Sequence, residues 1–384
     1  MNFQLSDEQA MLRDSVARYI KDQYNFDTRK KIISSEKGMS TESWAMFSDL
    51  GWLSIPFSEH YGGYGGGNED IAVIMEELGK GIVVEPFVPT IMLFGGLLSH
   101  CGPNKISADL IPKIIEGRCL GAFAYLERQS RFEITDIKTT ATHSKKGWCI
   151  NGSKSVVLNG SNATHIIVAA RTSGGQYDSS GISLFMVDAD TQGISILPYG
   201  MMDGHKAANI NFDGVIIPAD ALLGKLDGGM KFVEKIMPQV LIGLCAEAIG
   251  IMAVLNEATI AYTKTRHQFG VPISSFQALQ HRMVDTFMAA EQARSMVYRA
   301  LCAFSEGSLE VENERMRSLH AMKITVAKSS KLIGEEAIQI HGGMGMTDEL
   351  NIGHYVKRLM TINLMFGDGD YHQRRFNQIS YEAA

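Results

Sequence analysis

The stretch YTKTRHQFGVPISSFQALQHRM, which runs from Tyr262 to Met283, joins the first two of four long helical patterns near the end of the chain. In these patterns apolar residues recur at helical spacing with short links between them, over 232–266, 276–306, 314–341 and 354–380. Helices of this length with short connections favour a four-helix bundle. The C-terminal part of the chain is therefore predicted to be such a bundle.

The order of patterns along the chain predicts an α+β protein. From Asp7 onward the apolar spacing is helical, and SDEQ forms a capping start before the first helix. Near Gly117 the segments become short, rich in β-formers and separated by turn residues, which indicates a small barrel or sandwich of antiparallel strands. A chain of 384 residues is too long for one compact core. We predict an N-terminal helical domain over 1–118, a middle antiparallel β domain over 119–226 and the bundle over 227–384.

Composition excludes several classes of partner. The net charge of −6 argues against nucleic acid or an anionic membrane surface, because both favour a basic face. The first twenty residues mix acidic and apolar side chains, unlike a signal or transit peptide, and no uninterrupted apolar run is long enough to span a bilayer. The five cysteines are odd in number and far apart, as reduced thiols of a cytosolic protein would be. We expect a cytoplasmic protein without a membrane span.

No metal site is expected from the histidines. His341, His354 and His372 are too far apart for two ligands one helical turn apart, and no cysteine or carboxylate set accompanies them. We interpret them as surface or interface histidines.

Two motifs in the predicted bundle indicate the family. Arg-x-Gln-Phe-Gly-x-Pro-Ile begins at Arg266, and Gln-x-x-Gly-Gly-x-Gly begins at Gln339. With these motifs in this order, the chain resembles the acyl-CoA dehydrogenase family of flavoproteins over essentially its whole length. Within that family it is most similar to the small-subunit type of two-subunit enzymes for pimeloyl-CoA. The resemblance implies the three-domain fold and FAD as cofactor.

The resemblance also implies which residues hold FAD. In the family the two motifs come from different subunits, so the cofactor would lie across a dimer interface. A guanidinium offers a pyrophosphate a planar donor fork, and glycines let backbone N–H groups approach it closely. The alternative is a solvated arginine and an ordinary helix-capping glycine. The expected set is Arg266, Gln268, Phe269 and Gln277 from one chain, with Gln339, Gly342 and Gly343 from the other.

The middle domain matches the family less well. In the family two strands cover the flavin ring, and of their residues this chain keeps Tyr125 and Asn159. Val156 and Leu158 stand where the family has a tryptophan and a threonine. The resemblance therefore implies a more apolar flavin pocket with altered redox tuning.

The family's general base is missing from its usual positions. The reaction needs a carboxylate to remove the proton α to a thioester carbonyl. Most members use a glutamate near the C-terminus, and an ungapped count to that position lands here on Phe366 or Gly367. A second family position falls on Val240. In LMFGDGDYHQRRF, Asp368 is the candidate base, and the alternative is that it caps a helix that begins near Asp370.

Glu247 is a further carboxylate to consider, because it falls in an apolar helix. A buried glutamate is either paired or functional. We favour pairing with an arginine of the bundle such as Arg294 or Arg299.

Together these observations predict an enzyme, an FAD-dependent acyl-CoA dehydrogenase. It would desaturate a CoA thioester at the α,β bond and pass electrons to an electron-transfer flavoprotein. It would act as a homo-oligomer or, by its subfamily, as one subunit of a hetero-oligomer with a second acyl-CoA dehydrogenase subunit. One alternative is a catalytically silent subunit that completes a partner's FAD site. The other is an oxidase of the same fold.

Overall fold

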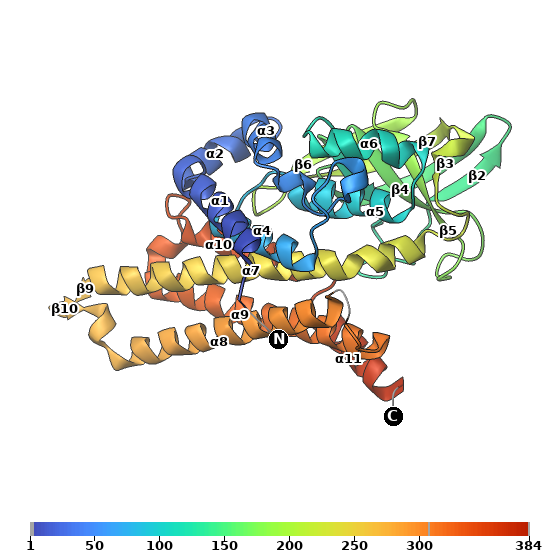
Figure 1. Cartoon of the computed structure of the whole chain (residues 1–384). Helices are drawn as coiled ribbons and strands as arrows, with labels where there is room; N and C mark the ends of the chain where they lie inside the picture. Colours follow the sequence, from blue (N-terminus) through green and yellow to red (C-terminus); the bar gives the residue numbers. More distant parts are fainter. Residues whose placement is uncertain (1–3, 306–307, 383–384) are drawn as a thin grey trace. The chain divides into compact units, whose positions relative to one another are not determined.

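The computed structural model describes residues 4–305 and 308–382 (Figure 1). The chain forms two compact units that interleave along the sequence. The unit that we call the helical unit comprises Met1–Lys30, Gly67–Val83 and Leu241–Ala384. The unit that we call the sheet unit comprises Lys31–Gly66 and Val84–Val240.

The helical unit is built from long helices that pack side by side. They are α1 (Asp7–Gln23), α4 (Asn68–Gly81), most of α7 (Met230–Thr265), α8 (Gln277–Phe304), α9 (Glu312–His341), α10 (Ile352–Leu364) and α11 (Gly369–Glu382). α9 packs against α8, α10 and α11, and α1 packs against α4. The capping box that SDEQ predicts is present, because Ser6 and Gln9 exchange hydrogen bonds at the start of α1.

The fourth predicted helix is broken into two, which corrects the sequence interpretation. α10 ends at Leu364 and α11 begins at Gly369, with a turn between them. Phe366 has φ +56° and Gly367 has φ +113°, and neither value continues a right-handed helix. The predicted end of the second helix at 306 lies outside the described residues.

The sheet unit holds a mixed sheet rather than a purely antiparallel barrel or sandwich. Its strands are β1 (Gly121–Ala124), β2 (Thr140–Ser144), β3 (Gly147–Leu158), β4 (His165–Arg171), β5 (Ile182–Asp188), β6 (Ile194–Gly200), β7 (Lys206–Ile217) and β8 (Leu222–Leu223). The order is β6-β7-β3-β2-β4-β5-β8. Most pairs are antiparallel, but β1 pairs with β4 in parallel, from Gly121 opposite His165 to Ala124 opposite Val168.

Two features explain why this sheet forms. β4 and β5 are apolar on both faces and almost wholly buried, as central strands are. On β3 buried Trp148 and Ile150 alternate with more exposed residues, so one face packs on the core. Short helical elements complete the unit, namely α3 (Thr41–Asp49), the π-helix η3 (Phe87–Gly95), α5 (Gly96–His100) and α6 (Lys105–Ile115); α2 (Phe26–Ser34) lies where the chain passes between the units.

In the described part of the chain, α7 is the one helix long and apolar enough to cross a bilayer by length and composition. However, 78% of its most apolar stretch is buried inside the protein. A buried core helix passes the same test, so α7 gives only weak support for a membrane span.

Candidate functional site

The first family motif forms a hairpin at the end of α7. The short strands β9 (His267–Gln268) and β10 (Val271–Pro272) pair across Phe269 and Gly270, and the hairpin lies beyond the ends of α7 and α8 (Figure 1). Phe269 has φ +54° and is 92% exposed. Arg266, Gln268 and Gln277 are also exposed. The hairpin therefore presents these side chains outward, available to a ligand or a second chain.

The second motif ends α9. Gly342 has φ +61° with ψ −143°, a conformation that favours glycine. A Cβ added at Gly342 or Gly343 would meet no atom within 4 Å, so their backbone is open to approach. Gly345, in contrast, packs against Ile338, and Gln339 is exposed. The open backbone at Gly342 and Gly343 leaves room for a phosphate or adenosine to approach.

Within one chain the two motifs lie at the same end of the helical unit. The Tyr262 ring, four residues before Arg266, stacks on His341 with 4.4 Å between ring centroids. The Tyr262 hydroxyl also donates to the His341 carbonyl at 3.4 Å. His341 is buried within the single chain, so the sequence interpretation of it as a surface or interface histidine was wrong.

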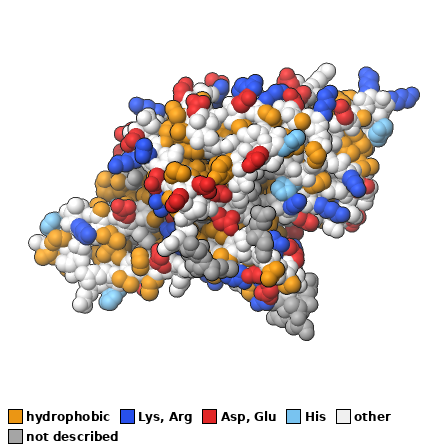
Figure 2. Space-filling view, in the orientation of Figure 1, with side chains coloured by type: hydrophobic (Ala, Val, Ile, Leu, Met, Phe, Trp, Pro, Cys, Tyr) orange, Lys and Arg blue, Asp and Glu red, His pale blue; other side chains and the backbone are white. Residues whose placement is uncertain are grey.

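Apolar side chains gather on the surface over this end of the helical unit (Figure 2). On α8 they recur three and four residues apart, and the α7 end and the hairpin add more. The exposed residues are Ile260, Phe269, Val271, Val284, Phe287 and Met288. A group of exposed apolar residues of this kind marks an interaction surface.

The two candidate flavin residues of the middle domain lie in the sheet unit. Asn159 is 5% exposed, and its Oδ1 accepts from Asn162 Nδ2 at 2.9 Å. Its own Nδ2 is buried and has no partner among the described residues. A buried donor without a partner is unfavourable by about 1–3 kcal/mol unless a ligand or water satisfies it. Tyr125 is half-buried, stacks on Phe123, and has a pKa raised by burial.

A buried ion pair supports the strand that leads to Asn159. Lys154 Nζ lies 2.8 Å from Glu127 Oε1 and also donates to the Tyr125 carbonyl at 3.1 Å. Burial acts to raise the pKa of Glu127, but the Lys154 charge and several donors outweigh it and hold that pKa at about 2. Two residues further on, Val156 has φ +52°. A β-branched residue in that region is strained, and such strain concentrates at functional sites.

The turn between α10 and α11 holds Asp368 as the N-cap of α11. Its Oδ1 accepts from the Tyr371 N–H at 2.7 Å, and its carbonyl accepts from the His372 N–H at 3.0 Å. The helix-cap alternative is therefore seen in the structure. Oδ2 accepts no hydrogen bond from the described residues and is left for other chemistry. Asp370 is exposed.

Gly367, one of the two positions where the count to the family's glutamate lands, cannot carry a side chain in this backbone. A Cβ there would lie 2.4 Å from Tyr371 Cδ1 and 2.9 Å from His372 Nε2. The turn is therefore built around a glycine at this position.

Glu247 is paired, as favoured, but with a different arginine. Arg358 of α10 binds it through Nε to Oε1 at 2.5 Å and Nη2 to Oε2 at 2.7 Å, and both side chains are buried. Arg294 pairs instead with Glu76, and Arg299 with Glu310. A carboxylate committed on both oxygens is no candidate for a base.

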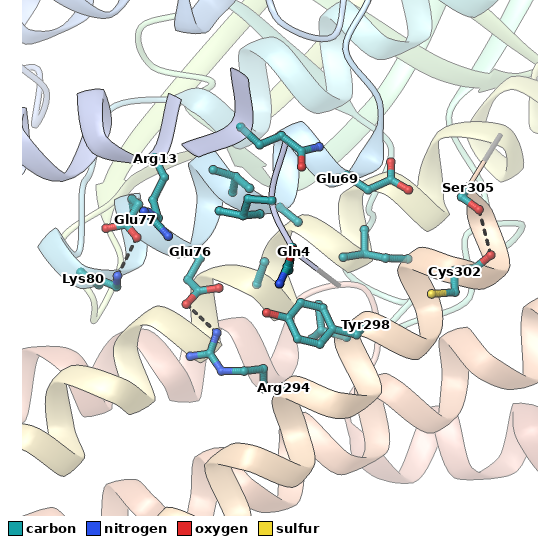
Figure 3. A pocket seen from close by; sticks show the side chains of 17 residues that line it. Gln4, Arg13, Glu69, Glu76, Glu77, Lys80, Arg294, Tyr298, Cys302 and Ser305 are labelled. Atoms are coloured by element: carbon teal, nitrogen blue, oxygen red, sulfur yellow. Dashed lines mark hydrogen bonds and ion pairs between the residues drawn. The ribbon is translucent and has the colours of Figure 1, made fainter. Parts of the chain in front are cut away.

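A pocket of about 610 Å³ lies in the helical unit among α1, α4, α7 and α8 (Figure 3). It contains none of the site residues predicted from the sequence. Its charged side chains are largely paired with each other, Glu76 with Arg294 at 2.8 Å and Glu77 with Lys80 at 2.6 Å. Nothing in its lining connects it to the two motifs.

Over residues 4–305 and 308–382, no group of three histidine, cysteine or acidic side chains is placed to hold a metal ion.

Comparison with known proteins identifies the chain. Models of three acyl-CoA dehydrogenase domains match it in order, the N-terminal domain over 6–118, the middle domain over 122–215 and the C-terminal domain over 227–378. The chain belongs to the acyl-CoA dehydrogenase family. This membership confirms the predicted three-domain α+β fold and an oxidoreductase acting on CH–CH bonds.

Three similar proteins match this acyl-CoA dehydrogenase chain over nearly its whole length. A probable acyl-CoA dehydrogenase, YngJ, of Bacillus subtilis is 31% identical over 94% of this chain and 95% of its own length. An L-prolyl-[peptidyl-carrier protein] dehydrogenase of a Serratia species is 26% identical over 96% of each chain. An FAD complex of PigA has a TM-score of 0.92 at 25% identity and covers 100% of both chains. That complex agrees with the prediction of FAD as cofactor.

Two observations test whether the residues present fit FAD. The open backbone at Gly342 and Gly343 leaves room for a phosphate or adenosine. Asn159 Nδ2 is a buried donor that lacks a partner among the described residues. Both are features that a bound cofactor would complete, so the residues fit.

Proposed function

We propose that this acyl-CoA dehydrogenase chain is a cytoplasmic FAD enzyme that desaturates a CoA thioester at the α,β bond and passes electrons to an electron-transfer flavoprotein. The observation that carries the proposal is the turn between α10 and α11, where Asp368 keeps one carboxylate oxygen uncommitted. The family match over all three domains supports the reaction class.

In this proposal the chain's own residues bind FAD at both motifs. The Arg266 guanidinium and the backbone N–H groups of Gly342 and Gly343 hold the phosphates, and Phe269 offers an apolar face. The remaining residues of the set are Gln268, Gln277, Gln339, Tyr125 and Asn159. When bound, FAD would accept the hydride that leaves the β carbon of the substrate.

We further propose that Asp368 takes the α proton through Oδ2. The Tyr371 N–H fixes Oδ1, and this contact orients the carboxylate without using its second oxygen. Glu247 is excluded from the role by its two bonds to Arg358. The family positions Val240, Phe366 and Gly367 carry no acid.

The assembly in this proposal is an oligomer in which the two motifs of different protomers share one FAD. The exposed apolar residues of α8 and the hairpin support burial of this surface against a second chain. The partner is a second copy or, by the subfamily resemblance, another acyl-CoA dehydrogenase subunit.

One observation favours a second candidate function. Asp368 caps a helix, and a cap alone accounts for an aspartate at this position. In that case the chain is a catalytically silent subunit that completes the FAD site of a competent partner.

The test begins with purified full-length protein loaded with FAD. Anaerobic bleaching of the flavin by short-, medium- and long-chain acyl-CoA, without any partner, supports self-sufficient dehydrogenation. FAD that bleaches only after a second subunit is added supports the silent-subunit function. Failure to bind FAD under any reconstitution would overturn both.

Asp368→Asn sharpens this test, because asparagine still accepts from the Tyr371 N–H and caps α11 but is no base. We expect this variant to keep its stability and to lose flavin reduction by at least about 100-fold. Asp370→Asn is the matched control. If Asp368→Asn reduces its flavin at the wild-type rate, Asp368 is only a cap.

A further inference from the structure

A fully buried lysine lies behind the turn between α10 and α11. Lys323 of α9 is 1% exposed, and its Nζ donates to the carbonyls of Ile362 at 2.6 Å, Met365 at 3.1 Å and Asn363 at 3.4 Å. These carbonyls lie in the last turn of α10 and just beyond it, where helix geometry leaves few N–H partners for the oxygens. The Ile362 carbonyl also accepts from the Met365 N–H at 3.2 Å. One ammonium thus satisfies the end of the helix that leads to Asp368.

This charge has no direct counter-ion. In the described part of the chain no carboxylate lies within 4 Å of Lys323 Nζ, although the Asp368 charge acts on it at longer range. The negative end of the α10 dipole is its main compensation. A buried ammonium is unfavourable compared with an apolar side chain of the same length, so its presence calls for a role beyond packing.

A histidine pair holds the next residue of the turn. His372 Nε2 lies 3.2 Å from the Phe366 carbonyl, and His372 Nδ1 lies 2.8 Å from His320 Nδ1. A carbonyl only accepts, so the network assigns the hydrogen of His372 to Nε2. His320 Nδ1 then donates to His372 Nδ1. Both rings are buried within the single chain, which corrects the interpretation of His372 as a surface or interface histidine.

We propose that Lys323, together with the His320–His372 pair, forms a buried polar clamp that positions the turn Met365–Asp368 for catalysis. Lys323 is the positioning residue of this clamp, and it acts through the backbone of the turn without touching substrate. The clamp explains how Phe366 is held at φ +56°, a value that a bulky residue adopts only under constraint. The kinetic part of this proposal rests on the proposed role of Asp368, but the clamp itself does not.

The clamp needs the charged form of Lys323. An ammonium has three N–H donors for three carbonyls, whereas a neutral amine has two and turns a lone pair toward the third oxygen. Burial lowers the pKa of Lys323 to about 8, with the Cys245 and Asp368 charges opposing it. The other titratable groups that face it are Cys245, whose pKa burial raises to about 11, and His372, whose pKa burial lowers to about 3.

Deprotonation of Lys323 removes a hydrogen bond from the turn, yet over the same pH range it contributes a rise in the stability of the whole fold. Because the folded pKa of Lys323 lies below the unfolded value of 10.5, the unfolded chain binds more protons between pH 8 and 10.5. This group therefore makes global stability rise with pH over that window. The turn, in contrast, loses one hydrogen bond over the same window.

The experiment is hydrogen exchange by mass spectrometry on the full-length FAD-loaded protein, corrected for intrinsic rates. The reporters are the amide of Met365, which bonds to carbonyls in the last turn of α10, and those of Tyr371 and His372, which bond to Asp368. Peptides from α1 are the internal control. In wild type we expect corrected exchange at the reporters to rise about tenfold from pH 7 to pH 9.5, while corrected exchange in α1 does not rise. Equal protection at both pH values would overturn the clamp, and this arm needs no variant.

Lys323→Met and Lys323→Gln supply the second arm. In each variant at pH 7, the reporter amides should exchange as fast as the same amides of wild type do at pH 9.5. Their corrected exchange should not depend further on pH. A folded Lys323→Met with wild-type protection at the turn would refute the proposal. In kinetics, the limiting rate of flavin reduction should fall above about pH 8 in wild type and be low at all pH in Lys323→Met, with little change in KM. If Asp368→Asn proves active, only this kinetic arm lapses, and the exchange data still decide whether the clamp exists.

Discussion

Arg358 of α10 holds both carboxylate oxygens of Glu247 of α7, and both side chains are about 95% or more buried. Removing one partner leaves the other charge buried and unpaired. We expect Arg358→Met to lower the free energy of unfolding by about 3–5 kcal/mol. Denaturant unfolding of the purified protein measures this directly.

Arg299→Met is the matched control, because Arg299 pairs with Glu310 while 42% exposed. This variant should lower the free energy of unfolding by less than about 1 kcal/mol. The double variant Glu247→Met with Arg358→Met should be more stable than either single variant, since no charge is then left unpaired. If Arg358→Met and Arg299→Met lower the free energy of unfolding equally, the buried pair is no more important for stability than the exposed one, contrary to our prediction.

Gly367→Ala should destabilise the protein by about 1–3 kcal/mol. The new Cβ would collide with the Tyr371 ring, and the φ of +113° disfavours any side chain. Gly343→Ala is the control, because a Cβ there meets nothing within 4 Å. Thermal unfolding of the two variants without FAD compares them, and a lower Tm for Gly343→Ala than for Gly367→Ala would be the opposite of what we expect.

Arg266→Ala should weaken FAD binding by about 10- to 100-fold, the effect of losing a charge-assisted hydrogen bond of roughly 1.5–3 kcal/mol. Folding should be little affected, because Arg266 is exposed. Titration of apoprotein with FAD, followed by flavin fluorescence, gives the affinity. Lys264→Ala removes an exposed cation two residues away, and an equal loss of affinity in that variant would point to general charge rather than to the motif.

Acid should weaken the fold through the histidine pair. Burial lowers the pKa of His320 to about 4 and of His372 to about 3, from a value of 6.5 in the unfolded chain. The unfolded state thus binds more protons below pH 6.5, and stability present above that pH is lost as pH falls toward 4. Each group adds up to about 1.4 kcal/mol per pH unit in that window.

The measurement is the free energy of unfolding from pH 7 to pH 4.5. His320→Gln should flatten its decline, because one titrating group of the pair is gone. His281→Gln controls for the loss of a histidine at an exposed position of α8. If the free energy of unfolding of His320→Gln falls with pH as steeply as that of wild type, the histidine pair does not cause the acid sensitivity.

Sequence patterns predicted the local features of this protein and missed those that depend on packing. The capping box at Ser6 and the hairpin motif at Arg266 are contiguous, so a few neighbouring residues define them. The helical pattern over 354–380 missed the break between α10 and α11, although the capping alternative for Asp368 implied a new helix near Asp370. Only the backbone conformation of Phe366 and Gly367 stops the helix.

Long-range partners were harder to predict. Glu247 was correctly expected to be paired, but its partner depends on which face of α10 turns toward α7. Lys323 stands between the apolar residues Met322 and Ile324 of α9, and a charge at such a position is the one signal that the sequence offered. The parallel pairing of β1 with β4 likewise joins segments more than forty residues apart, which no local pattern specifies.

Gly367 limits which amino-acid substitutions this turn can accept. The volume that a side chain at this position would occupy is filled by Tyr371 and His372, which belong to the next helix. A glutamate installed there by a single substitution meets two rings, one of which also holds the Phe366 carbonyl. An engineered return to the family's usual base therefore requires coupled changes at positions 367, 371 and 372. The turn is an epistatic unit, in which the order of substitutions decides whether each intermediate folds.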